Sequence, residues 1–279
     1  MPTTNRMLNP RARKQRQAHR HHVSGTMSHP HVLREEKTKH WKLITAVLLL
    51  IPIAGVTLVT AAQLMGRAFL YQSFWKSSEL GFFLLGGVAW WVMYYCGARL
   101  IGFYVWGHEA SHAIVALGCG GKILDFQANA SGGYVDTTKS NTWITLAPYL
   151  VPLYTLLVLL ISMAVGFFVE MRVSVPVEIG PVSFGFRPVW ISAFIVGWSW
   201  FFHVTYTVKT IRLEQGDLVR NGEFFSIMLI FLTNILLLIG MFLMAAPGPD
   251  LTVGEVLGTW WHNAVETIAA LWTVATETI

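Results

Sequence analysis

The sequence is poor in charged residues and in cysteine. Of its 279 residues, 13% are charged and 54% are apolar, and the mean hydropathy is +0.51. A soluble globular domain carries roughly twice this share of charge, so the composition predicts an all-α polytopic membrane protein. The two cysteines, Cys96 and Cys119, provide neither a disulfide framework nor a Cys₄ metal site.

The sequence also has no internal repeat, no Walker loop and no dinucleotide-binding fingerprint. Its formal net charge of +5 does not indicate nucleic-acid binding, because half of the 20 Lys and Arg residues lie in the first 42 positions. We therefore expect no nucleic-acid partner. The basic residues of this segment are Arg6, Arg11, Arg13, Lys14, Arg16, Arg20, Arg34, Lys37, Lys39 and Lys42.

Residues 1–40 combine this basic charge with few large apolar residues, which predicts a disordered tail. A secretory signal would place an apolar stretch and a small-residue cleavage site here, and neither is evident. The first apolar run is therefore expected to stay in the protein as an anchor. Because Lys and Arg near membrane ends are retained on the cytoplasmic side, the tail predicts a cytoplasmic N-terminus.

Five apolar runs follow, and each reaches the ~20 residues that cross a hydrocarbon core. The second is long enough for a helix of about 57 Å, so it is either one tilted or kinked span or two short ones divided near Gly97-Ala98-Arg99. We favour one span here, which gives about five transmembrane helices in total. The runs are Trp41–Met65, Leu80–Leu117, Trp143–Val169, Val189–Val208 and Phe224–Ala245.

Five crossings would leave residues 209–222, which contain three basic residues, in the cytoplasm, and residues 246–279, which contain none, outside. The segment 246–279 has apolar residues at helical spacing, but Glu255, His262 and Glu266 are costly in lipid. We therefore expect an extracytoplasmic amphipathic helix that lies on the membrane rather than a sixth span. Glycine-bounded, alternating stretches at 121–136 and 172–187 each predict a small β-hairpin.

The sequence Gly107-His108-Glu109-Ala110-Ser111-His112 contains an H-E-x-x-H pattern at the end of the second apolar run. On a helix, His108 and His112 lie one turn apart on one face, about 6 Å apart along the axis. Imidazole is a good Zn²⁺ ligand, and catalytic zinc sites use three protein ligands so that one position stays open for water. This pattern predicts a zinc site with Glu109 as the general base, since ionisable residues in apolar runs are usually functional.

This motif and its membrane setting resemble the site-2 protease family of intramembrane zinc metallopeptidases. The similarity covers the H-E-x-x-H residues, Cys119-Gly120, the strand-like stretch through Tyr134 and the order of apolar runs, so it implies a transmembrane metallopeptidase-like domain over residues 41–245. It also implies a membrane-protein or peptide substrate and an aspartate from a later span as third ligand. Where the family often has Asp-Gly within an apolar helix, this chain has Gly216-Asp217-Leu218.

Four residues are candidates for the third zinc ligand: Asp125, Asp136, His203 and Asp217. The first two lie in a glycine-rich connection, where solvated or turn-forming aspartate is common. If one helix continued from His203 to Asp217, the two side chains would be about 21 Å apart along it, so only one of them can bind the ion. We favour Asp217, because it lies nearer the cytoplasmic end, as the motif does, and matches the family's aspartate in chain order.

Two functions remain open. The first is an intramembrane endopeptidase that hydrolyses peptide bonds in or near transmembrane segments. The second is a metal-binding membrane protein without proteolytic activity, such as a pseudoprotease, a partner-binding regulator or a transporter. The two differ at Glu109, because hydrolysis needs its carboxylate as a base and metal binding does not. The sequence predicts contact with the lipid bilayer in both cases and does not indicate an oligomeric state.

Overall fold

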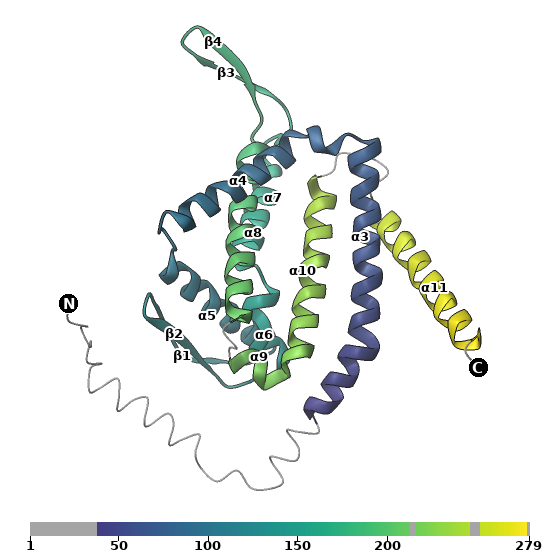
Figure 1. Ribbon diagram of the computed structural model, residues 1–279. Helices are drawn as coiled ribbons and strands as arrows, with labels where there is room; N and C mark the ends of the chain where they lie inside the picture. Colours follow the sequence, from purple (N-terminus) through teal and green to yellow (C-terminus); the bar gives the residue numbers. More distant parts are fainter. Residues whose placement is uncertain (1–37, 213–215, 246–251, 278–279) are drawn as a thin grey trace, which may run out of the picture. The chain divides into compact units, whose positions relative to one another are not determined.

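The computed structural model describes residues 38–212, 216–245 and 252–277, most of which are helical. The predicted tail up to residue 37 and the start of the predicted C-terminal segment, residues 246–251, lie outside this part. Met1–Lys42 and Leu43–Ile279 are two separate units. The second contains η1 (Ala46–Leu50), α3 (Ile51–Tyr71), η2 (Phe74–Lys76), α4 (Ser78–Tyr95), α5 (Ile101–Gly118), β1 (Ile123–Asn129), β2 (Gly132–Thr137), α6 (Thr142–Leu150), α7 (Leu153–Gly166), β3 (Val175–Ile179), β4 (Val182–Phe186), α8 (Val189–Ile211), α9 (Gly216–Asn221), α10 (Glu223–Ala245) and α11 (Val253–Glu277) (Figure 1).

Three helices in the described ranges are long and apolar enough to cross a membrane: Thr38–Tyr71, Val189–Ile211 and Glu223–Ala245. The bent pair α6–α7 makes four if it counts as one span. The predicted class, a mostly helical protein with membrane-type helices and a small hairpin, is therefore confirmed. The described helices account for three or four spans rather than the predicted five.

The apolar run 80–117 forms two helices and not the one continuous helix of about 57 Å that its length allows. Helix α4 ends at Tyr95 and α5 begins at Ile101. Between them, Gly97 has φ +96° and Leu100 has φ +47°, in the left-handed region, so the right-handed helix cannot continue. The break includes Gly97, where the sequence allowed a division of this run into two short spans.

The run 143–169 is also divided, at Val151-Pro152, where α6 and α7 meet at 70°. Proline lacks the N–H of a helical hydrogen bond, and its ring crowds the preceding turn, which accounts for the bend. The bend keeps α6 beside α5 and lets α7 pack against α8.

Helices α4 and α8 cross closely at two glycines. A Cβ atom at Gly86 would lie 2.0 Å from the Phe194 carbonyl oxygen, and one at Gly197 would lie 1.9 Å from the Phe83 carbonyl oxygen. Small residues at such crossings let membrane helices approach backbone to backbone. Below the crossing, an aromatic cluster centred on Trp90, Phe202 and Tyr206 holds α4, α5 and α8 together.

Both predicted hairpins are present. Strands β1 and β2 pair antiparallel directly after α5, and β3 and β4 pair antiparallel between α7 and α8. Figure 1 shows the two hairpins at opposite ends of α8. The predicted C-terminal helix forms as α11, and it contacts α3 through polar atoms: Asn263 Nδ2 donates to Thr60 Oγ1 at 2.9 Å, and Trp260 Nε1 donates to Thr57 Oγ1 at 3.0 Å.

Candidate metal centre

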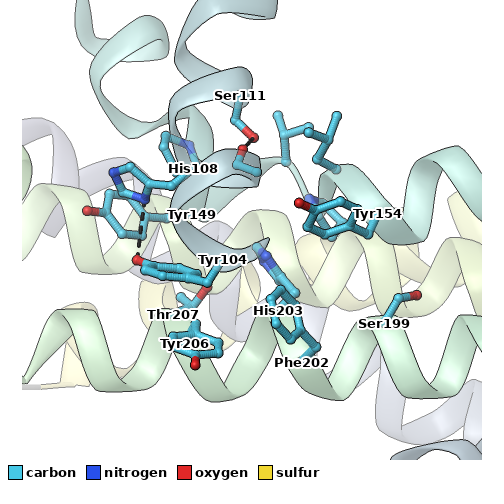
Figure 2. A pocket seen from close by; sticks show the side chains of 15 residues that line it. Tyr104, His108, Ser111, Tyr149, Tyr154, Ser199, Phe202, His203, Tyr206 and Thr207 are labelled. Carbon is cyan, nitrogen blue, oxygen red and sulfur yellow. Dashed lines mark hydrogen bonds between the residues drawn. The ribbon is translucent and has the colours of Figure 1, made fainter. Parts of the chain in front are cut away.

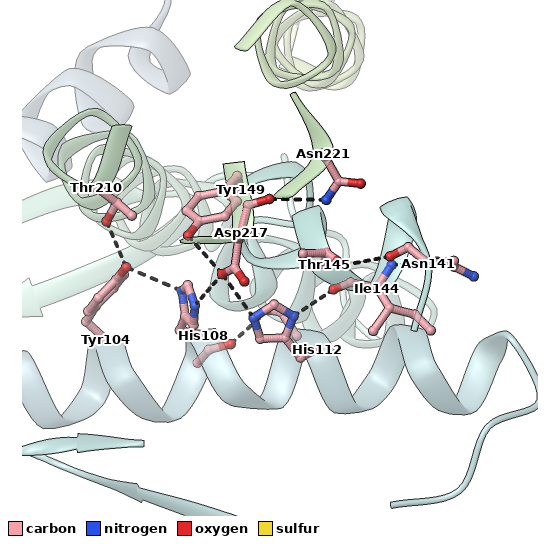
Figure 3. A network of polar contacts seen from close by, with 12 residues as sticks. Tyr104, His108, His112, Asn141, Ile144, Thr145, Tyr149, Thr210, Asp217 and Asn221 are labelled. Atoms are coloured by element: carbon pink, nitrogen blue, oxygen red, sulfur yellow. Dashed lines mark hydrogen bonds and ion pairs between the residues drawn. The ribbon is translucent and has the colours of Figure 1, made fainter. Parts of the chain in front are cut away.

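The structure brings together the three ligands favoured from the sequence, His108 and His112 of α5 and Asp217 of α9 (Figure 3). One potential ligand atom from each residue lies within 4.8 Å of the other two. Asp217 Oδ2 is 3.8 Å from His108 Nε2 and 3.7 Å from His112 Nε2. Within the described ranges this is the one group of three such side chains that is suited to hold a metal ion.

These separations fit a shared ion better than direct pairing. A hydrogen bond between these nitrogen and oxygen atoms would need about 2.7–3.2 Å. Around a tetrahedral zinc ion with ligand distances of about 2.0–2.2 Å, the ligand atoms lie roughly 3.4 Å apart. The side chains of His108 and His112 are 12% and 11% exposed and that of Asp217 is 32% exposed, so the group is partly buried but open on one side.

The orientation of His112 depends on a proline in the neighbouring helix. His112 Nδ1 lies 2.6 Å from the Ile144 carbonyl oxygen, so Nδ1 carries the proton and Nε2 keeps its lone pair for a metal. In an unbroken helix, the N–H of residue 148 would donate to this carbonyl. Residue 148 is Pro148 and has no N–H, so the carbonyl is left available to His112.

The other imidazole is oriented by a tyrosine on its own helix. Tyr104 precedes His108 by one turn, and its hydroxyl oxygen lies 3.3 Å from His108 Nδ1 and 2.9 Å from Thr210 Oγ1 (Figure 3). If His108 binds a metal through Nε2, its Nδ1–H donates to Tyr104, whose own hydroxyl can donate to Thr210. Such partners fix the tautomer and the ring direction of a histidine ligand.

Asp217 is held in place by its own short helix. The next residue, Leu218, is 1% exposed and packs with Leu146, Tyr149 and Ile230, while Asn221 Nδ2 donates to the Asp217 carbonyl at 3.1 Å. Burial alone would raise the pKa of the Asp217 carboxyl, but the two imidazoles and the Tyr149 hydroxyl, 3.3 Å away, hold this pKa below its usual value. The carboxylate is therefore ionised at neutral pH, as a metal ligand must be.

Glu109, the predicted base, follows His108 on α5 and lies close enough to His108 and Asp217 to feel their charges. Strand β2 packs against it. A Cβ atom at Gly133 would lie 2.8 Å from both Glu109 Cγ and Val105 Cγ1, so only glycine allows the strand to come this close. The β1–β2 hairpin therefore forms one wall beside the carboxylate.

The other candidates for the third ligand lie outside the group. Asp125 and Asp136 face each other across the β1–β2 ladder, and Asp125 accepts a hydrogen bond from Tyr134, which raises the pKa of that tyrosine. His203 lies on α8 and is not part of the group. The premise of one continuous helix from His203 to Asp217 was wrong, because α8 ends at Ile211 and Asp217 belongs to α9.

Sequence reasoning missed the residues that orient the ligands. Tyr104 was detectable in principle, since it is one helical turn before His108, and the missing N–H of Pro148 was visible as well. Tyr149 gave no local signal, because it reaches Asp217 through the packing of α6 against α9.

Comparisons with protein-family models, with curated proteins and with solved structures found no match to this chain. The function of this chain is therefore inferred from the geometry of the site.

Proposed function

We propose that this protein is an intramembrane zinc metalloprotease that hydrolyses peptide bonds in or near the transmembrane segments of other membrane proteins. The observation that carries the proposal is the convergence of His108, His112 and Asp217, with Glu109 on the same helix as the two histidines. Two imidazoles and a carboxylate are a common donor set of catalytic zinc sites, which leave one position open.

In this proposal each residue has a separate role. When bound, a zinc ion supplies Lewis acidity, which polarises the scissile carbonyl and makes water easier to deprotonate. Glu109 accepts a proton from the attacking water and later delivers it to the leaving amine. Tyr104 and the Ile144 carbonyl keep the two imidazoles in the orientation that presents Nε2.

A substrate helix must unwind before its backbone can be hydrolysed, since its amide groups are engaged in helical hydrogen bonds. The β1–β2 sheet has two strands, so each strand has an outer edge without a partner strand in the sheet. Because β2 lies against Glu109, a substrate segment added to this sheet as a strand would run beside the carboxylate.

The same proposal includes a topology of five crossings, in which α4 with α5 and α6 with α7 each cross once as broken helices. The N-terminus would then be cytoplasmic, the C-terminal helix α11 extracytoplasmic, and the metal group near the cytoplasmic side. In support, the β3–β4 hairpin precedes α8 and Asp217 follows it, so a crossing by α8 separates them.

The test is cleavage of a reporter membrane peptide by purified protein in lipid nanodiscs. We expect Glu109→Gln to retain zinc and fold but to abolish cleavage, because glutamine has a similar shape and cannot accept the proton. Glu170→Gln, which changes an exposed glutamate after α7, serves as the matched control and should cleave like wild type. Cleavage by Glu109→Gln at the wild-type rate would exclude the protease and leave a metal-binding membrane protein.

A further inference from the structure

A small pocket of about 30 Å³, room for about two water molecules, adjoins the metal group and shares His108 with it. Helices α5, α7 and α8 and the bend between α6 and α7 form its walls, with apolar and aromatic side chains such as Leu153, Tyr154 and Phe202 (Figure 2). A site for a peptide substrate needs room beside the metal, since the backbone next to the scissile bond must lie there.

Most polar side chains of this pocket are already hydrogen-bonded. Ser111 Oγ donates to the Gly107 carbonyl at 2.8 Å, Tyr154 donates to the Phe103 carbonyl at 2.7 Å, and Ser199 bonds to Thr155 at 3.1 Å. These groups are therefore not free to recognise a ligand without losing a partner. They shape the walls of the pocket and are not available to bind a substrate.

His203 differs from these groups. Its Nε2 atom is buried and has no hydrogen-bond partner, and no other side chain of this pocket has such an atom within the described ranges. Asn234 and the backbone of Tyr149 are polar neighbours of the ring, but neither has the distance and angle of a hydrogen bond to Nε2. The amide nitrogen of Asn234 already donates to the Tyr149 and Ile230 carbonyls, at 3.2 and 2.8 Å.

A buried polar atom without a partner is costly, so such atoms in folded proteins call for an explanation. An unwound substrate segment also has unpaired donors and acceptors, because its backbone N–H and C=O groups have lost their helical partners and meet no water in the bilayer. An imidazole nitrogen can either donate to a carbonyl or accept from an N–H, depending on the tautomer, so it can pair with such a segment.

We propose that this pocket receives one backbone amide group of the unwound substrate segment beside the scissile bond and that His203 Nε2 hydrogen-bonds to this group. This inference rests on the proposed protease function. It makes His203 a substrate-binding residue and not a metal ligand. It also predicts that the pocket selects unwound backbone rather than a particular charged side chain, because most of its other polar groups are engaged.

The experiment uses a reporter membrane peptide and a series of variants of it, each with one backbone amide near the scissile bond replaced by an ester. The replacement removes the N–H donor and weakens the adjacent carbonyl acceptor. Binding is measured in nanodiscs to the zinc-loaded Glu109→Gln variant, which should hold the peptide without cleaving it. The same titrations are made with His203→Phe, His203→Gln and Ser199→Ala added to Glu109→Gln.

We expect His203→Phe to weaken binding of the all-amide peptide about 10-fold, the loss of one hydrogen bond to a neutral partner. His203→Gln, which keeps a donor and an acceptor, should recover part of the loss. At one position, the ester should weaken binding by the same factor when His203 is present. The same ester should not weaken binding to the His203→Phe variant. Ser199→Ala changes another side chain of the same pocket, and it should not alter the effect of any ester on binding. All variants should retain zinc.

The inference is overturned if no ester position couples to His203, or if His203→Phe binds the all-amide peptide as tightly as its parent. Loss of zinc from both His203 variants would instead make it a metal-site residue and would also overturn the inference. If binding couples to His203 but wild type does not cleave the reporter, the protease proposal fails and the binding site stands.

Discussion

The hydroxyl oxygen of Tyr104 lies 3.3 Å from Nδ1 of His108, so the ring nitrogen of His108 that faces Asp217 is Nε2. The same hydroxyl contacts Thr210 on α8 at 2.9 Å. The direction of a candidate metal ligand thus depends on packing between α5 and α8, and this dependence can be tested without changing a ligand.

Replacing Tyr104 with phenylalanine removes the hydroxyl and keeps the ring stacked on Tyr206. We expect zinc affinity to fall by roughly 10- to 100-fold, the usual effect of losing a partner that orients a histidine ligand. Competition with a fluorescent chelator measures the affinity. Tyr71→Phe at the exposed end of α3 is the control and should have no effect. Equal affinities of Tyr104→Phe and wild type would show that the hydroxyl does not orient His108.

The third ligand can be tested with two aspartates that differ in position. Asp217→Asn should lose most of its zinc and all activity, because an amide is a weak ligand and Asp217 belongs to the His–His–Asp group. Asp125→Asn on the exposed β1 strand should retain both. Metal analysis of the purified variants distinguishes them. If Asp217→Asn retained its zinc and Asp125→Asn lost it, the third ligand would be on the hairpin.

The crossing of α4 and α8 predicts a stability difference between two glycines of the same helix. Gly86→Ala places a Cβ atom 2.0 Å from the Phe194 carbonyl and should destabilise the protein by roughly 1–3 kcal/mol, because the helices must move apart. Gly81→Ala has nothing within 4 Å and should be neutral or slightly stabilising. Thermal unfolding in detergent measures both. Equal melting temperatures would mean that the helices are not in close contact there.

The five-crossing topology predicts the sides of the two chain ends. In intact cells, a tag at the N-terminus should be protected from external protease, while a tag after Ile279 should be digested. Digestion of an engineered site in the β3–β4 turn gives an internal check, since this hairpin should also be outside. Protection or digestion of both terminal tags would mean an even number of crossings and would exclude the proposed topology.

Much of this fold was predictable because its signals are local. Hydropathy identified membrane-type helices, glycine and alternation identified both hairpins, and the spacing of His108 and His112 identified a shared helix face. The breaks were harder to predict. Gly97 and Pro152 were visible, but whether a long apolar run stays continuous depends on tertiary contacts such as the aromatic cluster around Trp90.

The candidate site also combines residues with local sequence signals and residues whose positions depend on tertiary contacts. His108, Glu109 and His112 form a local pattern, and Asp217 was favoured from chain order and resemblance. The position of Asp217 depends on Leu218, which anchors α9 among Leu146, Tyr149 and Ile230. Contacts of that kind join segments far apart in the chain, so no periodicity in the sequence reports them. The same holds for the unpaired nitrogen of His203.

The most direct test of the central claim is the zinc content of the purified protein beside that of His108→Ala, measured by mass spectrometry of the metal. The account predicts about one zinc ion per chain in wild type, as expected for a site with three protein ligands, and almost none in His108→Ala. His262→Ala, which removes an exposed histidine of α11, is the control and should keep its zinc. No metal in wild type, or an unchanged zinc content in His108→Ala, would contradict the account.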